Sequence, residues 1–543
     1  MNYNDKYKLW LNKVDDPELL RELQFMTEEQ KSNAFFKDMK FGTAGLRGTI
    51  GAGSNCMNKY NVCRVTQAIC EYMKNHNGKT LAVSYDSRNM SLEFAQMVAG
   101  VCAQNGIQVY ISNDMMPTPF LSYMVRYYGC DIGVMITASH NPKNYNGYKA
   151  YSSDGCQLLD EPSNEITEIA EKLDLFNTKM MDYDEAVQKG LVKLTDEKIL
   201  NDYISDVKMQ SFNRIENLKV AYTALNGTGV NTIPRTLKEQ GAEVVLNEVQ
   251  CKPDKNFTTC PYPNPEKLEV YEDTVRLAKK VNADIIIASD PDADRVGVRA
   301  KHNGEYVHLN GNEIGILLTD YIFSKSNIDG GWLVKSIVSA SLAEKVAKKY
   351  GGKVKNTLTG FRYIGSFITD LESQGMQDQF VIGFEESYGY LIGTHVRDKD
   401  ATVASLLLAE LASELKKQDK TLVDRLEELF EEFGAFYNEV LVFRYEGETG
   451  SHKMQEIMNS LRTNTTTEIG GYKVVEYFDY LQGVDGLPKS DVLIYNLEND
   501  GQVIVRTSGT EPLIKAYVAL TKTKEQNKKD IKTIKEDVEK VLS

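Results

Sequence analysis

The fold class follows from residues 80–139, which contain TLAVSYDS (80–87), SLEFAQMVAGVCAQNG (91–106), QVYIS (108–112) and IGVMITAS (132–139). Three of these runs are short and rich in β-branched residues, whereas the second is a longer amphipathic segment typical of a helix. Alternating strands and helices predict βα units around a largely parallel sheet. Each predicted strand ends in a polar loop, which is where α/β sheets usually bind their ligands.

The order of strand, helix and polar-ended strand begins again twice along the chain. It restarts at 218–229 and reaches a strand at 283–290, then restarts near 331–341 and reaches a strand at 379–387. The residues of the three stretches do not align, so an internal repeat stays an open interpretation.

The last part of the chain has a different pattern. After a helical segment at 400–433, two alternating runs surround Asn499-Asp500-Gly501, a strong hairpin signal. We expect an antiparallel sheet covered by helices. In the final helix, one apolar face is predicted from its spacing, and it comprises Ile531, Ile534, Val538 and Val541.

Length and composition limit the class of protein. At roughly 150 residues per domain, 543 residues give three to four domains. We place four domains at 1–205, 206–311, 312–436 and 437–543. Hydrophobic residues make up 42% and charged residues 26%, as in ordinary globular proteins.

Charge and cysteine usage narrow the possible partners. A net charge of -14 argues against a general nucleic-acid or anionic-membrane binder, so any anion must be bound at a local site. The eight cysteines lack a CxxC pair and are expected to be reduced and buried. The N-terminal segment has no apolar signal core, and no apolar run approaches ~18 residues. We therefore predict a cytoplasmic protein with no membrane partner; no segment stands out as an oligomer interface.

The clearest chemical signal is IIIASDPDADRVGV, in which Asp290, Asp292 and Asp294 alternate with residues that do not ionise. Three carboxylates this close repel one another unless a cation joins them, and oxygen ligands suit Mg²⁺. An EF-hand loop is excluded because its sixth and twelfth positions are Arg295 and Lys301 here. Arg295 is placed to bind a phosphate oxygen beside the metal. The alternative is a solvated acidic turn.

A second signal is GVMITASHNPKNYNGYK, where an apolar strand ends at Ser139. A serine there is a candidate nucleophile, but the adjacent His140 and the absence of a G-x-S-x-G elbow disfavour a hydrolase. A turn or a helix cap is the alternative. Lys149 adds a cation for proton transfer or phosphate binding.

Three further loops have candidate roles. Arg506-Thr507-Ser508-Gly509-Thr510 offers hydroxyls, backbone N–H groups and a guanidinium for a phosphate. The Gly-rich segment 41–53 carries Arg47 but no Walker Lys-Ser/Thr, so nucleotide binding is not supported. In 383–401, Glu385 and Ser387 suit sugar hydroxyls, and Arg397 and Lys399 suit phosphate. The alternatives are an ordinary turn for the Arg506 loop and a charged surface loop for 383–401.

Taken together and in order, these segments closely resemble the α-D-phosphohexomutase family along essentially the whole chain. The main matches are TASHNP (137–142), DPDADR (290–295), FEES (384–387) and RTSGTEP (506–512). Supporting matches are GTAGLRG (42–48), YDSR (85–88), LNGTG (225–229), PNPE (263–266), LNGNEIG (309–315) and TGFRYIG (359–365). The resemblance implies three α/β domains and a C-terminal α+β phosphate-binding domain around a central cleft.

The resemblance also implies roles for individual residues. Ser139 would be the phosphoserine and, with the three aspartates, a ligand of one Mg²⁺ per chain. Glu385 and Ser387 would contact sugar hydroxyls. The distal phosphate would be bound by Arg506, Ser508, Gly509, Thr510 and Lys515, and the transferring phosphoryl group would be surrounded by Arg47, His140, Lys149 and Arg295. Some members have a His after the sugar loop; here Tyr388 and Gly389 follow Ser387, so Lys399 with Lys149 is our choice for proton transfer.

The implied activity is interconversion of α-D-glucose 1-phosphate and D-glucose 6-phosphate through glucose 1,6-bisphosphate, which also serves as activator. FEES rather than GEMS favours glucose over mannose phosphates, and Ser387 favours hexose over pentose phosphates. Mannose and pentose phosphates are the alternatives. A silent phosphosugar-binding protein is disfavoured because Ser139 and all three aspartates are present.

Overall fold

A computed structural model of the protein describes residues 2–42, 45–326, 328–445, 447–464, 466–507 and 513–542. The chain forms two compact units, which are described separately. Unit 1 comprises Met1–Ile314 and Phe361–Asp419, and unit 2 comprises Gly315–Gly360 and Lys420–Ser543.

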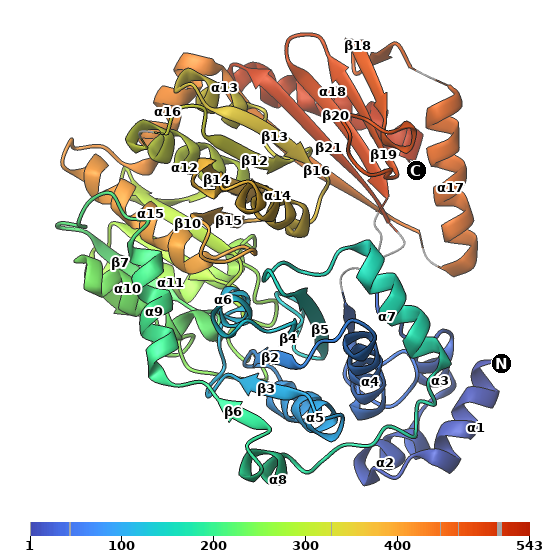
Figure 1. The fold of residues 1–543 in the computed structure, drawn as a ribbon. Helices are drawn as coiled ribbons and strands as arrows, with labels where there is room; N and C mark the ends of the chain where they lie inside the picture. Colours follow the sequence, from blue (N-terminus) through green and yellow to red (C-terminus); the bar gives the residue numbers. More distant parts are fainter. Residues whose placement is uncertain are drawn as a thin grey trace. The chain divides into compact units, whose positions relative to one another are not determined.

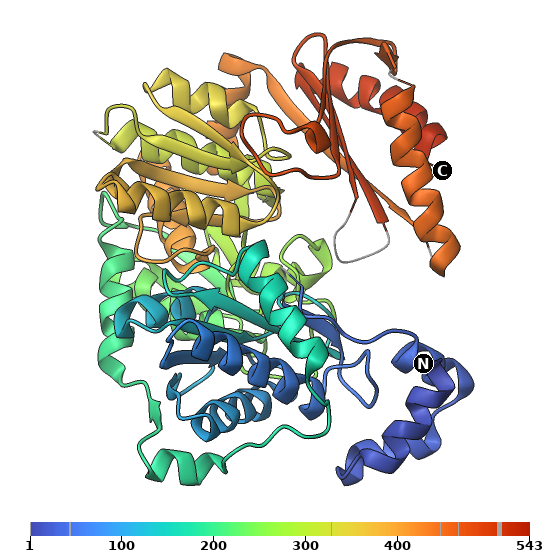
Figure 2. The ribbon, with the colours of Figure 1, turned by 45° about the vertical axis from the view of Figure 1, so that its right-hand side comes forward.

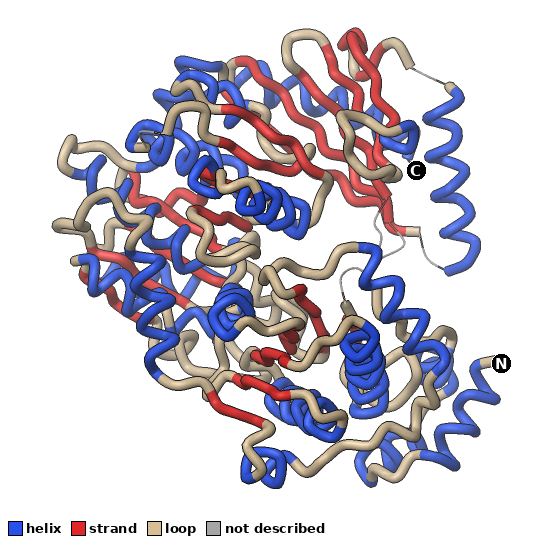
Figure 3. Tube along the Cα trace, in the orientation of Figure 1, coloured by secondary structure: helices blue, strands red, loops and turns tan. Residues whose placement is uncertain are grey.

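The first sheet of unit 1 has the strand order β1-β5-β4-β2-β3-β6. Strand β2 pairs in parallel with β3 and β4, and β5 returns antiparallel beside β4. Helices flank these strands, as the sequence predicts (Figure 1, Figure 3). The strands are β1 (Leu46–Thr49), β2 (Thr80–Tyr85), β3 (Gln108–Ile111), β4 (Ile132–Ile136), β5 (Tyr145–Ser152) and β6 (Val192–Leu194). The helices of this region are α4 (Lys59–Asn75), α5 (Ser91–Gln104), α6 (Thr118–Tyr128), α7 (Asp160–Lys172), α8 (Tyr183–Gln188) and α9 (Glu197–Lys208).

The second sheet of unit 1 has the order β11-β10-β9-β7-β8 and repeats the same plan. Strand β7 pairs in parallel with β8 and β9, and β10 returns antiparallel beside β9. The strands are β7 (Lys219–Thr223), β8 (Glu243–Leu246), β9 (Ile285–Ser289), β10 (Val296–His302) and β11 (Glu305–Leu309). The helices are η1 (Thr228–Asn231), α10 (Ile233–Gln240), η2 (Leu268–Tyr271) and α11 (Glu272–Val281).

Unit 1 also contains a strand pair and two sets of helices. Strand β14 (Phe380–Glu385) pairs antiparallel with β15 (Gly389–Ile392), near α14 (Phe361–Ser373), η3 (Gln377–Gln379) and the buried α15 (Ala401–Lys416). The N-terminal helices, drawn in dark blue in Figure 2, pack around the buried Trp10 and Phe35. They are α1 (Tyr3–Lys13), α2 (Pro17–Phe25) and α3 (Glu28–Phe35).

Unit 2 contains a parallel strand pair and a larger C-terminal sheet. The pair is β12 (Trp332–Ser336) with β13 (Lys353–Thr357), near α12 (Gly311–Lys325), which begins in unit 1, α13 (Leu342–Lys349) and α16 (Leu422–Phe433). The C-terminal sheet has the order β16-β21-β20-β19-β18-β17, with antiparallel pairing as predicted. Its strands are β16 (Ala435–Arg444), β17 (Glu468–Ile469), β18 (Tyr472–Asp479), β19 (Val492–Leu497), β20 (Gly501–Thr507) and β21 (Leu513–Lys522), with η4 (Tyr480–Gln482) between β18 and β19.

Helices cover one face of this C-terminal sheet. Residues of α17 (Gly447–Thr463) and α18 (Lys524–Leu542) share a hydrophobic core with the strands. Within α18, Ile531, Ile534 and Val538 are buried as predicted, but Val541 is 54% exposed. The prediction for Val541 was wrong because Leu542, three full turns after Ile531, continues the buried face instead.

Two further sequence predictions can be compared with the structure. All eight cysteines are free and buried, as predicted. Among the described helices, none is both long and apolar enough to cross a bilayer. The four domain boundaries stay predictions.

Candidate active site

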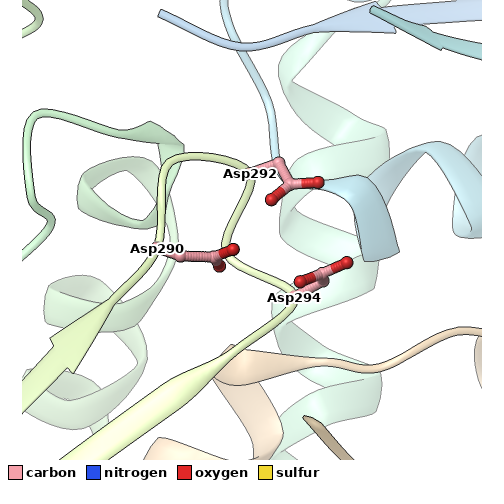
Figure 4. Close-up of side chains that lie close together, drawn as sticks. All are labelled: Asp290, Asp292 and Asp294. Carbon is pink, nitrogen blue, oxygen red and sulfur yellow. The ribbon is translucent and has the colours of Figure 1, made fainter. Parts of the chain in front are cut away.

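The three aspartates lie in the loop that joins β9 to β10. Their side chains point toward one another (Figure 4), and one carboxylate oxygen from each lies within 4.8 Å of the others. All three are buried. Ala293, between two of them, has the left-handed φ of +47°, and its N–H donates to the Asp290 carbonyl at 3.0 Å. This tight turn brings carboxylates from alternating positions into one cluster.

The cluster fits a divalent cation that prefers oxygen ligands. Asp292 Oδ1 and Asp294 Oδ1 are buried and accept no hydrogen bond from the described residues. Buried carboxylate oxygens without donors are costly unless a cation binds them. Burial, and then repulsion from Asp292 and Asp294, raises the pKa of Asp290 well above its ordinary value. Carboxylate-only ligation suits Mg²⁺ rather than a soft metal.

Ser139 lies beside this cluster although it is far away in sequence. Its hydroxyl donates to Asp290 Oδ2 at 2.9 Å and lies 3.2 Å from His140 Nδ1. Ser139 is 3% exposed, and its backbone φ is +52°. The end of β4 therefore delivers the predicted nucleophile to the predicted metal ligands.

Two lysines also contact the carboxylates of the cluster. Lys149 Nζ is 2.7 Å from Asp292 Oδ2 and 3.3 Å from Asp294 Oδ2. Lys399 Nζ is 3.2 Å from Asp294 Oδ2 and 2.9 Å from Asp398 Oδ1. Lys149 comes from β5, whereas Lys399 comes from the loop that precedes α15. Three separate segments thus meet at Asp294.

The electrostatics of these lysines follow from burial and from the carboxylates. Burial lowers the pKa of Lys149, but Asp292 and Asp294 raise it, and the net shift is upward. For Lys399, burial lowers the pKa, Asp294 and Asp398 raise it, and the net shift is again upward. Both side chains therefore bring positive charge to the site.

The remaining residues predicted around the phosphoryl group lie near the same cluster. Arg295 Nη1 pairs with Glu266 Oε1 at 2.8 Å, and its Nε lies 3.9 Å from Asp294 Oδ1. Arg47 Nη1 donates to Asn141 Oδ1 at 3.2 Å, in the loop of Ser139. Burial, followed by Arg295 and Arg47, lowers the pKa of His140 well below its ordinary value. A positive charge on His140 is thus disfavoured.

The predicted sugar loop joins β14 to β15. Glu385 is the buried last residue of β14, and Ser387 is half-buried. Burial lowers the pKa of Lys399, whereas Asp294, Asp398 and then Glu385 raise it. Tyr388, which follows Ser387, has the left-handed φ of +68°, and its hydroxyl lies 2.9 Å from His308 Nε2. The loop therefore lies in the neighbourhood of Lys399 with a defined backbone shape.

Arg397 lies apart from the aspartate cluster. It is fully buried and pairs with Glu372 Oε2 at 2.7 Å, while Arg126 pairs with Glu372 Oε1 at the same distance. Its N–H donates to Ser122 Oγ at 2.9 Å. These contacts tie the Lys399 loop to α6 and α14. Phosphate binding by Arg397 stays a prediction.

The predicted phosphate loop belongs to unit 2. Arg506 lies near the end of β20, opposite Lys515 of β21, and its Nε donates to the Tyr517 hydroxyl at 3.2 Å. Ser508, Gly509 and Thr510 lie outside the described residues. The role of this loop stays a prediction.

Two residues that contact the site were missed by sequence reasoning. The hydroxyl of Thr118, at the start of α6, donates to Asp292 Oδ2 at 2.8 Å. The 174 positions between these residues leave no local pattern to indicate the contact. Glu266, the partner of Arg295, lies in the matched PNPE segment, which was the available signal.

Comparison with known proteins gives consistent matches along the chain. Models of phosphoglucomutase/phosphomannomutase α/β/α domains I, II and III match residues 38–176, 201–304 and 310–433. A protein from Staphylococcus aureus named phosphoglucomutase is 36% identical over 531 residues, covering 94% of this chain and 95% of that protein.

Solved structures share the fold at lower identity. Parafusin, a phosphoglucomutase from Paramecium, is 18% identical with a TM-score of 0.72, over 93% of this chain and 95% of that one. N-acetylphosphoglucosamine mutase from Aspergillus fumigatus, solved with GlcNAc-6P and magnesium, is 14% identical with a TM-score of 0.51, over 93% and 96% of the chains. The domain matches, the fold and the site residues define a multidomain α/β isomerase of the mutase type. More specifically, the chain belongs to the phosphoglucomutase/phosphomannomutase family, the α-D-phosphohexomutases that its motifs resemble.

Proposed function

We propose that this protein is a phosphoglucomutase that interconverts α-D-glucose 1-phosphate and D-glucose 6-phosphate through a phosphoserine at Ser139. The observation that carries the proposal is the hydrogen bond of Ser139 Oγ to Asp290 Oδ2, which joins a serine to a buried three-carboxylate cluster. The relative from Staphylococcus aureus that bears the name phosphoglucomutase supports the choice of substrate. We place the activity in the cytoplasm, as predicted from the sequence.

In the first half of the reaction, the phosphate on Ser139 moves to the free hydroxyl of a hexose monophosphate. The bond from phosphorus to Ser139 Oγ breaks, a bond to the sugar oxygen forms, and the hydroxyl proton passes to a base of the site. The resulting glucose 1,6-bisphosphate turns end for end. Its other phosphate then returns to Ser139, and the proton flow is reversed.

The side chains of unit 1 have distinct parts in this sequence. Asp290 Oδ2 accepts a hydrogen bond from the Ser139 hydroxyl in the dephosphorylated state. Lys149 and Lys399, paired with Asp292 and Asp294, add positive charge near the transferring oxygens. We propose the same two lysines as the groups that move the proton, for which the accepting lysine must first be in its neutral form. Arg295 and Arg47 would bind phosphate oxygens, and Glu385 and Ser387 the sugar hydroxyls.

The metal site is proposed for one Mg²⁺ held by Asp290, Asp292, Asp294 and the phosphate of Ser139. When bound, Mg²⁺ supplies positive charge at the transferring phosphoryl group. In unit 2, Arg506 and Lys515, with Ser508, Gly509 and Thr510 outside the described residues, would bind the distal phosphate. Glucose 1,6-bisphosphate would act as activator because it phosphorylates Ser139.

A coupled assay that measures glucose 6-phosphate from glucose 1-phosphate, primed with glucose 1,6-bisphosphate, tests this function. Ser139→Ala should lower kcat by about 10³-fold or more, because it removes the nucleophile. Intact mass should show a phosphoryl adduct on the wild type and not on this variant. Ser112→Ala is a matched control, since Ser112 is buried and its hydroxyl has no partner among the described residues.

The same assay distinguishes the sugars. We expect kcat/KM to be higher for glucose 1-phosphate than for mannose 1-phosphate or ribose 1-phosphate, each primed with its own bisphosphate. A preference for the mannose or ribose compound would replace the substrate while keeping the mechanism. A wild type that turns over none of the three would contradict the proposal.

A further inference from the structure

Ser139 has a backbone conformation that is unfavourable for a residue with a Cβ, and its neighbours hold it in place. We propose that Asp86, Arg88 and Phe257 are positioning residues that hold Ser139 in this conformation and so aim its hydroxyl at Asp290. This inference rests on the proposed role of Ser139 as nucleophile.

The backbone N–H and C=O of Ser139 are bound by Thr137 and Arg88, both of which contact Asp86. The Ser139 N–H donates to Thr137 Oγ1 at 2.8 Å, and the Thr137 hydroxyl donates to Asp86 Oδ2 at 2.6 Å. The Ser139 carbonyl accepts a hydrogen bond from Arg88 Nη2. Asp86 Oδ2 and Arg88 Nε lie 3.2 Å apart, and neither side chain is exposed. The buried Asp86–Arg88 pair therefore holds the C=O of the nucleophile directly and its N–H through Thr137.

Arg88 also binds the loop that follows Ser139. It donates to the carbonyl of Asn141 at 2.5 Å through Nη2 and to the carbonyl of Pro142 at 2.9 Å through Nη1. Asp86 is held in turn by the hydroxyl of Ser91 at 2.6 Å. A planar guanidinium offers several donors in a fixed geometry, which a lysine ammonium does not reproduce.

Phe257 covers the guanidinium from another part of unit 1. Its ring centroid lies 4.9 Å from Arg88 Cζ, and the side chain is fully buried. Its φ of +46° is an outlier for a bulky side chain. Such strain persists where the surroundings over-determine it, often at functional sites. Here the turn is closed by Asp254, whose carbonyl accepts the Phe257 N–H at 2.9 Å.

These contacts explain why Asp86, Arg88 and Phe257 would affect turnover without touching substrate. The φ of +52° at Ser139 sets the direction of its Oγ, which lies 2.9 Å from Asp290 Oδ2. A misplacement of about 1 Å in a reacting group can cost roughly 10²-fold in rate. Loosening the backbone of Ser139 should therefore lower kcat and leave substrate affinity unchanged.

The main test is Arg88→Lys, compared with Arg299→Lys. Arg299 is a matched control because it also donates to a backbone carbonyl, that of Tyr306, and lies over an aromatic ring, that of Tyr271. We expect Arg88→Lys to lower kcat by roughly 10- to 100-fold, with KM for glucose 1-phosphate within about twofold. The control should keep kcat within about twofold. The transfer from phospho-Ser139 to glucose 6-phosphate, measured in a single turnover, should slow as much as kcat.

A second variant keeps the test decisive if Arg88→Lys does not fold. Thr137→Val has nearly the same shape but removes the hydroxyl that links Ser139 N–H to Asp86, and we expect a loss in kcat of about tenfold at unchanged KM. Phe257→Leu should give a smaller loss of about three- to tenfold. Wild-type kcat in a folded Arg88→Lys or Thr137→Val variant would overturn the inference.

The inference can fail separately from the proposed function. A wild type without mutase activity would overturn the proposed function but not the inference about Asp86, Arg88 and Phe257. In that case, crystal structures of the wild type and Arg88→Lys decide the inference: it predicts that Ser139 leaves the left-handed region in the variant. An unchanged φ at Ser139 would overturn it.

Discussion

The loop between β4 and β5 and the loop between β9 and β10 occupy the same place in two similar sheets. In each sheet, a strand pairs in parallel with two others, and the chain leaves the third strand through a loop before returning antiparallel. The first loop carries Ser139, and the second carries Asp290, Asp292 and Asp294. The fold thus provides an equivalent loop in each sheet. One loop carries the proposed nucleophile, and the other carries the proposed metal ligands.

The two loops also share a backbone feature. Ser139 has a φ of +52° and Ala293 a φ of +47°, each a few residues past the end of its strand. The loop between β14 and β15 has a third example, Tyr388 at +68°. A left-handed residue turns the chain sharply, so that side chains on both sides of it face one point. The comparison teaches that this turn is a property of the fold, whereas the side chains decide the function.

Asp290→Asn has the largest expected effect. It leaves one acceptor oxygen for two donors, the Ser139 hydroxyl and the Arg295 N–H, and it removes one charge from the aspartate loop. We expect kcat to fall by about 10³-fold or more and Mg²⁺ affinity to fall with it. The melting temperature of the metal-free protein should hold or rise, since three buried carboxylates repel one another. Steady-state kinetics, Mg²⁺ titration calorimetry and thermal melts measure these effects.

The control for this variant is Asp206→Asn, which alters a carboxylate that binds the Tyr123 hydroxyl in the same unit. It should keep near-normal kcat. Retention of more than a tenth of wild-type kcat in Asp290→Asn would show that Asp290 is dispensable and would contradict the proposed site.

Lys399→Ala tests the lysine that reaches Asp294 from the loop between β15 and α15. We expect kcat to fall by roughly 10²-fold, because a positive charge at 3.2 Å from Asp294 Oδ2 is lost. Phosphorylation of Ser139 by glucose 1,6-bisphosphate should still be possible, as seen by intact mass. Lys416→Ala, which removes a lysine paired with Asp284, is the control. Near-normal turnover in Lys399→Ala would refute its role in proton transfer.

Local patterns in the sequence predict much of this fold. The predicted strands at 80–87, 108–112 and 132–139 correspond to β2, β3 and β4, and the hairpin at Asn499-Asp500 forms with both residues left-handed. The third strand ends earlier than predicted, at Ile136, because the Thr137 hydroxyl accepts the Ser139 N–H and starts the turn. Periodicity identifies elements, but side-chain hydrogen bonds decide where they end.

The site could be predicted less completely. The aspartates were found because three carboxylates crowd one loop, and Ser139 because it ends an apolar strand. Contacts such as Thr118 with Asp292, or Arg397 with Glu372, depend on segments that meet only after folding. An arginine in a polar loop has the same local sequence whether it faces a phosphate or pairs with a glutamate. Sequence pattern alone therefore cannot distinguish these two environments.

The pH dependence of stability tests the contact of His308 with Tyr388 in the loop between β14 and β15. Burial, and then Arg299, lowers the pKa of His308 to about 4, while its Nε2 lies 2.9 Å from the Tyr388 hydroxyl. In the unfolded chain the pKa is about 6.5, so the unfolded state binds more protons below that pH. The free energy of unfolding should therefore fall as pH drops from about 6.5 to about 4, by roughly 1 kcal/mol per pH unit. His308→Gln should reduce this slope in melts at pH 7 and pH 5; an equal slope in both proteins would contradict the prediction.

Ala293→Gly gives the smallest effect and separates backbone from side chain in the two compared loops. Glycine relieves the left-handed strain, worth about 1–2 kcal/mol. It loses a buried methyl group, about 0.8 kcal/mol, and gains freedom in the unfolded chain, about 0.5–1 kcal/mol. These contributions nearly cancel, so we expect stability within about 1 kcal/mol of wild type and kcat within about threefold. A loss in kcat beyond tenfold with unchanged stability would mean that the Ala293 methyl group itself orders the aspartates, and that the side chain matters at this turn as it does at Ser139.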